Sequence, residues 1–361
     1  MILVMATRFV IILFFFLFSA CNDSINVIEL EDDPEEETYF NPGEYGGSSL
    51  EDKEDIYNVT FSNDGERVAL IRRRTPGNLT EPIRQLWIVD KDGRNPEFIA
   101  SGTQSIAWSE DDSRIASTFV IGGQHTFVIV IDLEKRIAKQ LTGSPDHTIN
   151  RYNAANPQFM PGSSNLLVSV WGQAYQQDYD IGVYVINYED ESVEGPLGEY
   201  LNRANLGNNG AFFSAFYLDT VSGDYSNIFV NYDFSTGGLD EINPELTGTE
   251  FRLDNSTPNP RGNEIILEIR RDFADQLVKT SFSLEHFEQI TELGGHNVKW
   301  MPDGNFVFIR DIHKGSGAHY VPHKYNSTTG TITKLWDDLP DYVPEFPPTN
   351  NFTPIDITID W

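Results

Sequence analysis

Nine of the chain's arginines stand in short stretches that could bind an anion. They are Arg72, Arg73, Arg74, Arg84, Arg151, Arg203, Arg270, Arg271 and Arg310. Aromatic and amide residues stand among them, Trp171 and Tyr175 included. Guanidinium groups hold carboxylates through paired hydrogen bonds, and aromatic faces stack on sugar rings or side chains. These residue types indicate a site for an acidic glycan or peptide, unless the arginines pair with nearby acids such as Glu81, Asp178 and Asp272.

Three histidines form a second candidate. His313, His319 and His323 occur within RDIHKGSGAHYVPHKY, residues 310–325. Histidine is the commonest transition-metal ligand. On a regular strand, however, residues four apart are separated by about 13 Å, so His319 and His323 could not chelate one ion together. We therefore expect no metal here, and these three histidines are the candidates if a metal does bind.

The motifs of several enzyme classes are missing from the sequence. It contains no Gly-x-Ser-x-Gly, no His-Glu-x-x-His and no glycine-rich phosphate loop ahead of a helix. The stretch Ser62-Asn63-Asp64-Gly65 is one residue shorter than the Ser-x-Asp-x-Gly of sialidase blades. No catalytic residue can be named from the sequence, and no cofactor is expected.

The composition excludes one class of partner and favours one class of fold. The 361 residues include 25 Lys and Arg against 55 Asp and Glu, a formal net charge of −30. Such a surface repels phosphate backbones, so nucleic acid is not expected as a partner. Aromatic residues make up 12%, and there are 28 glycines and 19 prolines, which is typical of β-rich, turn-rich proteins.

A short phrase recurs along the chain. FSNDGERVAL at 61–70 and WMPDGNFVFI at 300–309 both read as an aromatic residue, an Asp-Gly and an apolar run. Weaker copies are IAWSEDDSRIAST at 106–118, PQFMPGSSNLLVSV at 157–170 and NSTPNPRGNEIILEI at 255–269. The anchor positions are Phe61, Trp108, Phe159, Thr257 and Trp300, spaced by 47, 51, 98 and 43 residues. The interval of 98 holds two units, so the sequence predicts six.

Each unit contains alternating apolar residues that predict four strands, here named A, B, C and D. Repeats of this length with four strands each are the blades of a β-propeller. The Asp-Gly marks the turn from A to B, since glycine adopts a positive φ and aspartate bonds the turn backbone. The aromatic anchor is expected to pack between blades. The B–C and D–A loops share one end of a propeller, and the nine arginines fall in or beside these loops.

The turn phrases FSNDG, WSEDD, FMPGS and WMPDG resemble the aromatic-Ser-Pro-Asp-Gly repeat of TolB-like six-bladed propellers, over about residues 56–336. The resemblance implies an all-β fold whose members serve as scaffolds, peptide sensors, protease side domains or enzymes, including lyases that hold a metal through histidine. The expected blades lie near 56–100, 101–143, 150–198, 205–248, 250–293 and 295–336. The strand-like IDITIDW, within 353–361, is expected to complete the first blade and close the ring.

The N-terminus predicts export and lipidation. Arg8 precedes ten apolar residues, 9–18, too few to cross a bilayer, and then Ser19-Ala20 and the single cysteine, Cys21. FSAC resembles a bacterial lipoprotein signal, which implies cleavage before Cys21 and lipid on it; an ordinary secretory signal is the alternative. Residues 1–20 are then the signal peptide, 21–55 an acidic flexible tether and 56–361 the propeller. Residues 22–55 hold thirteen acidic residues and one lysine.

The sequence leads to three hypotheses of function. The first is an outer-membrane lipoprotein, on the periplasmic side or the cell surface, whose B–C/D–A end binds an envelope protein or an anionic glycan. The second is a polysaccharide lyase or glycoside hydrolase acting at the channel mouth. The third is a structural subunit of an envelope complex, which would expose an apolar patch.

Overall fold

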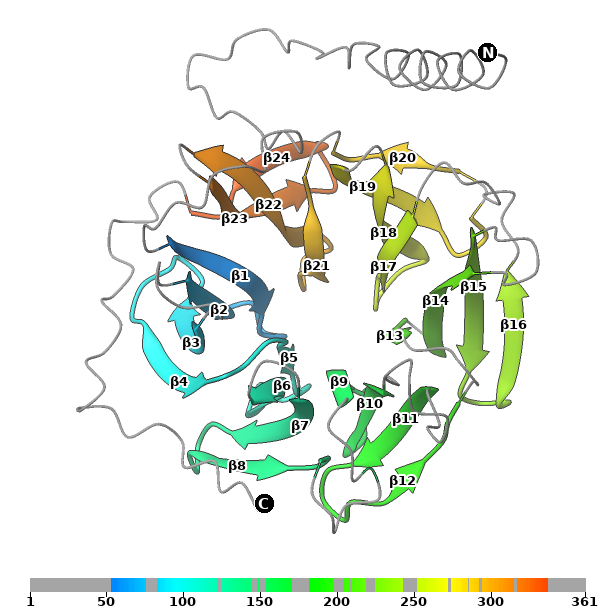
Figure 1. Ribbon diagram of the computed structural model, residues 1–361, viewed down its shortest axis with the longest axis horizontal. Helices are drawn as coiled ribbons and strands as arrows, with labels where there is room; N and C mark the ends of the chain where they lie inside the picture. The colour runs from blue at the N-terminus through cyan, green and yellow to red at the C-terminus, as the bar shows by residue number, and fades with distance from the viewer. Residues whose placement is uncertain are drawn as a thin grey trace, which may run out of the picture. The chain divides into compact units, whose positions relative to one another are not determined.

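The computed structural model describes residues 53–75, 83–121, 125–143, 149, 154–170, 182–197, 204–207, 210–218, 225–242, 252–271, 274–284, 286–291, 294–314 and 317–336. All regular elements of these residues are β-strands, which form six four-stranded antiparallel sheets. Figure 1 shows the sheets as blades around a common axis. The expected all-β propeller of four-stranded blades is confirmed. Within the described residues, no helix is long and apolar enough to cross a membrane.

Each blade consists of four consecutive strands. The first three blades comprise β1 (Lys53–Phe61), β2 (Arg67–Thr75), β3 (Ile83–Asp90), β4 (Glu97–Ser101), β5 (Ala107–Trp108), β6 (Arg114–Ile121), β7 (His125–Asp132), β8 (Ile137–Gln140), β9 (Ala154–Phe159), β10 (Asn165–Val170), β11 (Gly182–Asn187) and β12 (Val193–Glu194). The last three comprise β13 (Ala204–Leu206), β14 (Gly210–Leu218), β15 (Tyr225–Asp233), β16 (Gly238–Ile242), β17 (Arg252–Pro258), β18 (Glu264–Arg271), β19 (Ala274–Ser281), β20 (Glu288–Gln289), β21 (His296–Trp300), β22 (Phe306–Lys314), β23 (Gly317–Asn326) and β24 (Thr331–Lys334).

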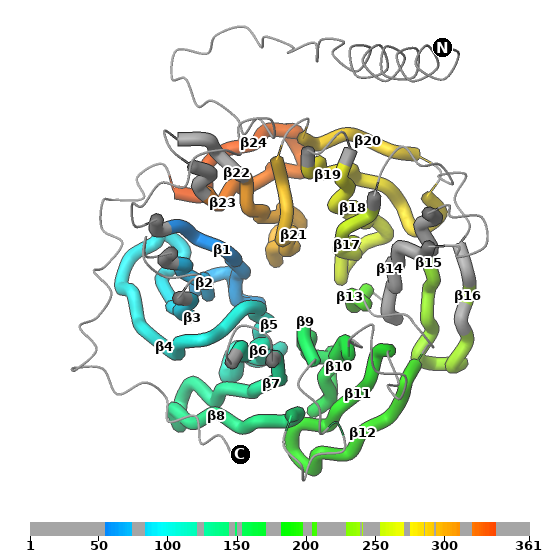
Figure 2. The backbone as a smooth tube through the Cα atoms, viewed as in Figure 1, coloured from blue at the N-terminus to red at the C-terminus, as the bar shows by residue number. Residues whose placement is uncertain are grey.

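The strands of a blade pair in chain order, with strand A nearest the axis and strand D outermost (Figure 2). Alternation places apolar side chains on both faces of each blade, so every blade buries two faces against its neighbours. Six apolar clusters result, one at each seam between successive blades. The aromatic anchors lie at these seams as expected. Trp108 donates from Nε1 to the carbonyl of Thr60 (3.3 Å), and Trp300 does the same to Thr257 (3.0 Å).

The A–B turns have the construction that the repeated phrase predicts. Asp64 Oδ1 accepts hydrogen bonds from Ser62 Oγ (2.6 Å) and from the backbone N–H of Glu66 (2.9 Å), and Gly65 has φ +75°. In blade 2 the glycine position is taken by Asp112, at φ +56°. Its carboxylate accepts hydrogen bonds from the backbone N–H groups of Asn63 (2.7 Å) and Asp64 (2.9 Å) in blade 1. The left-handed residue thus joins two blades.

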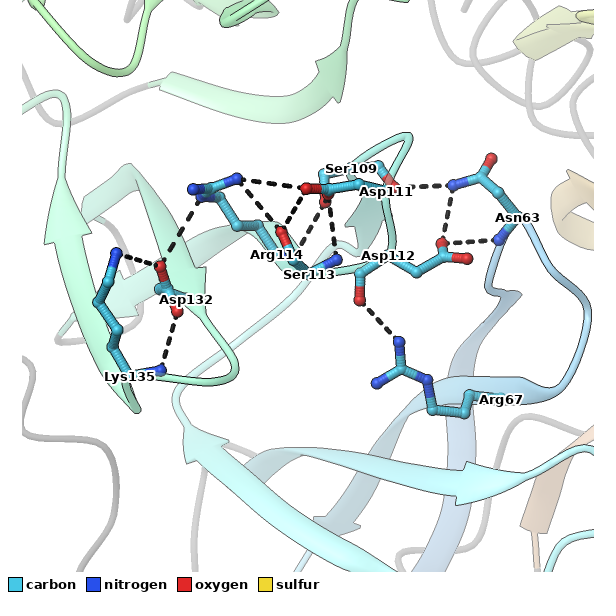
Figure 3. A network of polar contacts seen from close by, with 9 residues as sticks. All are labelled: Asn63, Arg67, Ser109, Asp111, Asp112, Ser113, Arg114, Asp132 and Lys135. Atoms are coloured by element: carbon cyan, nitrogen blue, oxygen red, sulfur yellow. Dashed lines mark hydrogen bonds and ion pairs between the residues drawn. The ribbon is translucent and has the colours of Figure 1, made fainter.

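Figure 3 shows the hydrogen bonds and ion pairs that the carboxylates of these turns make with neighbouring protein groups. Asp111 accepts hydrogen bonds from the hydroxyls of Ser109 (2.6 Å) and Ser113 (2.7 Å), which lower its pKa to about 2. Asp132 accepts hydrogen bonds from both the backbone and the side chain of Lys135. These carboxylates stabilise the turns, as the sequence suggested, and their internal bonds argue against a metal-binding role.

The ring is closed at the seam between blades 6 and 1. Asn297 donates from Nδ2 to the carbonyl of Tyr57 (3.0 Å), and Trp336 donates from Nε1 to that of Lys91 (3.2 Å). The Trp336 ring packs against Gly93. A Cβ atom at position 93 would lie 3.3 Å from this ring, so glycine is the residue that avoids a close contact there. Blade 1 already has four strands from residues 53–101, and the strand expected at 353–361 lies outside the described residues, as do the signal peptide and Cys21.

The start of β1 differs from the expected boundary. The described residues all belong to the second of two units, residues 38–361, and β1 begins at Lys53, inside the segment expected to be tether. Glu54 and Asp55 stand opposite Arg74 and Arg73 of β2. Acidic residues are uncommon in strands, so the sequence favoured a tether here. Basic residues directly opposite on β2 stabilise these acidic positions within the sheet.

Candidate functional site

At the B–C end of blade 1, three charged residues form one row across β1, β2 and β3. Asp55 stands directly opposite Arg73, and Arg73 directly opposite Arg84. Asp55 accepts two hydrogen bonds from Arg73, at 2.9 Å from Nε and 2.5 Å from Nη2. Both guanidinium groups lie over the ring of Tyr57, at 5.6 Å and 5.3 Å. Arg73 and Arg84 are like charges directly opposite each other in the sheet, which is destabilising, and the carboxylate of the row is bonded to Arg73.

Within the described residues, Arg84 is the member of this row that has no counter-ion. Its side chain is half-buried, and its Nε is buried without a hydrogen-bond partner. Among the described residues no carboxylate lies within ion-pair distance of it. A desolvated donor without an acceptor costs free energy, and the contact with Tyr57 offsets only part of this loss. The arrangement can accept a carboxylate or another oxyanion.

Blade 5 has a related row whose two outer positions both differ, because Arg252 of β17 and Asp275 of β19 stand opposite Arg270. Counting from the A–B turn, Arg270 of β18 occupies the place of Arg73, and Asp275 of β19 that of Arg84. Arg270 donates from Nε to Asp275 (2.8 Å), and its Nη2 lies 3.4 Å from Asp254. The central arginine of blade 5 therefore has two carboxylates.

Blade 6, between these two, contributes aromatic groups. Tyr320 of β23 occupies the position of Arg84 in its own blade, and Arg73 lies over its ring at 4.0 Å. The ring of His296 meets Tyr320 edge-on at 5.1 Å. Burial, with the charges of Arg73 and Arg270, lowers the pKa of His296 to about 4, although Asp275 opposes the shift. His296 is therefore neutral at pH 7, and the cluster joins blades 5, 6 and 1.

The structure brings together some of the predicted arginines. Arg73, Arg84 and Arg270 belong to the cluster. Arg72 is buried on β2, at 2% exposure, and Arg310 is half-buried on β22. The side chains or whole residues that fall outside the described part of the chain are those of Arg74, Arg151, Trp171, Tyr175, Arg203 and Arg271.

Acidic partners exist, as the alternative interpretation required, but they are different acids. Asp55, Asp254 and Asp275 pair with the arginines, whereas Glu81 and Asp178, like the side chain of Asp272, lie outside the described residues. The anion-binding role of the whole set stays a prediction.

The histidine candidates are placed only in part. The backbones of His313 and His319 lie in β22 and β23, and their side chains are not described. His323 is buried, with its ring stacked on Phe308 (5.8 Å) and Nδ1 3.0 Å from the carbonyl of Val321. In the described part of the chain no three His, Cys, Asp or Glu side chains are grouped to hold a metal ion.

Strands β18 and β21 add two ionisable residues that sequence reasoning missed. Glu268 is buried and accepts hydrogen bonds from the backbone N–H of Val298 (3.0 Å) and from Asn255 (3.3 Å); burial raises its pKa. Burial lowers the pKa of Lys299 on β21. Tyr57, His296 and Tyr320 were missed as well. The position of each residue relative to the A–B turn of its blade could have identified it. That position can be assigned only when the strand register of each blade is known.

Comparison with known proteins supports the fold. No protein-family model matches the sequence, and no curated protein matches it significantly. Among solved structures, TolB of Acinetobacter baumannii is 13% identical, with 78% of each chain covered and a TM-score of 0.53. The β-propeller domain of the Trilobed protease from Pyrococcus furiosus is 13% identical over 78% of this chain and 82% of that one, with a TM-score of 0.51.

The tricorn protease is 15% identical, with a TM-score of 0.55, over 78% of this chain but 26% of its own. The chain likewise spans 53% of the AtxE2 isopeptidase that it matches. At these identities the likeness concerns the fold, which is a TolB-like β-propeller. Such propellers occur both in proteases and in TolB, so function must be argued from the site.

Proposed function

We propose that this chain is a lipid-anchored bacterial envelope protein whose propeller binds an anionic group of a partner protein or glycan at Arg84. The observation that carries the proposal is the row Asp55–Arg73–Arg84, in which Asp55 is bonded to Arg73 and Arg84 has no carboxylate partner among the described residues. A ligand oxyanion would supply the acceptor that Arg84 lacks. The FSAC sequence ending at Cys21 supports the lipid anchor, and the acidic residues 22–52 would hold the propeller off the membrane surface.

The energetics favour binding at this position over binding at exposed arginines. A hydrogen bond to a charged group contributes about 1.5–3 kcal/mol, and a bidentate carboxylate makes two. Exposed ion pairs contribute only about 0–1 kcal/mol because water and salt screen them. Arg84 is half-buried against Tyr57, so its interaction with an anion is screened less.

The test is binding of two acidic probes, hexaglutamate and an oligogalacturonate, to the full mature chain by isothermal calorimetry. R84Q should raise the Kd of the bound probe at least about tenfold, the loss of one charged hydrogen bond. R94Q is the matched control, since Arg94 lies in the C–D turn of the same blade, pairs with Asp92 and has an 80% exposed side chain. Equal losses in R84Q and R94Q, or no binding of either probe, would overturn the role of Arg84.

The lipid anchor is tested separately. In the bacterial host, the wild-type protein should partition with membranes and C21A should be released from them. The enzyme hypothesis gives a different result in the calorimetric samples, because a lyase or hydrolase would shorten the oligogalacturonate. Mass spectrometry of the recovered sugar detects this directly.

A further inference from the structure

The charges of the row in blade 1 leave Arg84 as a single open positive charge. Asp55 carries one negative charge, and Arg73 and Arg84 carry one positive charge each, so the row as a whole has a single positive charge. Arg73 is already engaged, because its Nε and Nη2 donate to Asp55 at 2.9 Å and 2.5 Å and its guanidinium lies 4.0 Å from the ring centroid of Tyr320. An anion that enters this row therefore meets one open guanidinium, that of Arg84.

Among the described side chains, the charged groups of blade 5 do not supply a second open cation. Arg270, whose charge reaches His296 of the cluster, is paired with both Asp254 and Asp275. These three side chains of blade 5 together carry a single negative charge. His296 itself is neutral at pH 7, because burial lowers its pKa to about 4. The described surroundings of the row therefore do not favour a second negative charge on the ligand.

The aromatic rings of the cluster favour a ligand with a slender stem. Stacking on a sugar ring needs an open aromatic face. Tyr57 already has both guanidinium groups over its ring, at 5.6 Å and 5.3 Å, and Tyr320 has that of Arg73 over its ring. A flexible acidic side chain needs no open aromatic face to bring a carboxylate to Arg84. The geometry therefore favours an acidic side chain of a protein partner over a glycan.

We propose that Asp55 sets the specificity of the Arg84 site: by neutralising Arg73, it selects a single carboxylate, an aspartate or glutamate side chain of a protein partner, over a phosphorylated side chain. A phosphoserine carries about −1.5 to −2 charges at pH 7. The charge in excess of Arg84 would be partly buried without a counter-ion, which is costly. Asp55 acts through Arg73 and needs no contact with the ligand. The inference deepens the proposed function and rests on it.

The test uses three peptides with blocked ends, Gly-Ser-Gly-X-Gly-Ser-Gly, in which X is glutamate, glutamine or phosphoserine. Each competes with hexaglutamate for the full mature chain. The glutamate peptide should bind at least about tenfold more tightly than the glutamine peptide, which lacks the charge, and about three- to tenfold more tightly than the phosphoserine peptide. In D55N the row gains a positive charge, so the order of glutamate and phosphoserine should reverse. In D55N/R73Q the row again has one positive charge, and the wild-type order should return.

D92N is the matched control for D55N. It removes one negative charge from the C–D turn of the same blade, where Asp92 pairs with Arg94 and has a 52% exposed side chain, so the order of the peptides should stay as in the wild type. The same reversal in D92N would show a general charge effect and overturn the inference. Circular dichroism and thermal unfolding establish that D55N is folded, since Asp55 is buried. If D55N does not fold, the order of the peptides on the wild type decides.

The remaining outcomes separate this inference from the proposed function. A phosphoserine peptide that binds the wild type as tightly as the glutamate peptide overturns the inference. Tighter binding of a galacturonate trimer than of triglutamate would assign the ligand to a glycan and overturn it as well. In both cases the role of Arg84 stands if R84Q weakens hexaglutamate binding. If R84Q leaves that binding unchanged, the proposed function fails, and the specificity assigned to Asp55 fails with it.

Discussion

Blades 1 and 5 place the same kinds of residue at the same end of the propeller and differ in how the charges are arranged. In blade 5 the central Arg270 lies between Asp254 and Asp275. In blade 1 the central Arg73 is bonded to Asp55 on one side and faces Arg84 on the other. The strand positions opposite the central arginine differ on both sides: Asp55 and Arg84 in blade 1, Arg252 and Asp275 in blade 5.

The difference teaches that a count of arginines does not identify an anion site. Arg270 carries the same charge as Arg84, yet two carboxylates already pair with it, and an incoming anion would have to replace one. What distinguishes Arg84 is a buried Nε without an acceptor. The two blades also differ in burial, because the Asp55 side chain is 2% exposed whereas Asp254 and Asp275 are 23% and 26% exposed.

The largest effect is expected from breaking the central pair of each blade. R73A leaves the buried Asp55 carboxylate without its bidentate partner, which should lower the free energy of unfolding by about 3–5 kcal/mol. R270A removes a pair whose arginine is 45% exposed, and it should cost about 0.2–1 kcal/mol. Urea denaturation of both variants measures the difference.

The double variant D55A/R73A is the control for this comparison. It removes the buried charge together with its partner and should recover part of the stability that R73A loses. Equal losses in R73A and R270A would contradict the difference in burial between the two blades.

The second effect concerns His296, which both central arginines influence. Its pKa is about 4 in the folded protein, against 6.5 for an ordinary histidine. Between these values the unfolded chain binds the proton and the folded chain does not, so stability should fall as pH drops from about 6.5 to about 4. The loss should amount to roughly 3 kcal/mol at most.

The measurement is the free energy of unfolding of wild type and H296N across this pH range. The difference between the two should shrink toward low pH, because carboxylate titrations are common to both. R270Q should also raise the His296 pKa, followed by NMR, since it removes one of the two positive charges. A His296 pKa near 6.5 in the wild type would contradict its burial among cations.

The A–B end of the propeller could be predicted from the sequence, and the candidate site could not. Several A–B turns carry versions of one short phrase whose aromatic anchor and turn residues have fixed local roles, so Phe61 and Trp108 align without a structure. At the other end, Arg73 and Arg84 are separated by ten residues, while Arg270 and Asp275 are separated by four. Because the loop lengths differ, sequence spacing cannot show that Arg84 and Asp275 hold equivalent positions.

Aromatic members of the site were hidden for a related reason. Tyr320, on strand C of blade 6, reaches Arg73 only because blade 6 is the ring neighbour of blade 1, and His296 on strand A packs against Tyr320. The contact between Tyr320 and Arg73 joins residues more than 200 positions apart. Local patterning determines each strand, but ring closure determines which strand ends meet.

The smallest effect is expected from exchanging the charges at the two equivalent strand-C positions, 84 and 275. This exchange is also the most direct test of the comparison between the two blades. R84D gives blade 1 the opposite-charge pair that Arg270 and Asp275 form in blade 5 and removes two like charges from opposite positions, so stability should rise by about 0.2–1 kcal/mol. Hexaglutamate binding should disappear at the same time. D275R makes the opposite change, and it should lower stability by a similar amount and add a weak binding position for the probe. Thermal unfolding, with a shift of roughly 2 °C per kcal/mol, and calorimetry check both variants. A stability gain in R84D with binding unchanged would mean that the probe binds elsewhere, since the row in blade 1 would then be fully paired.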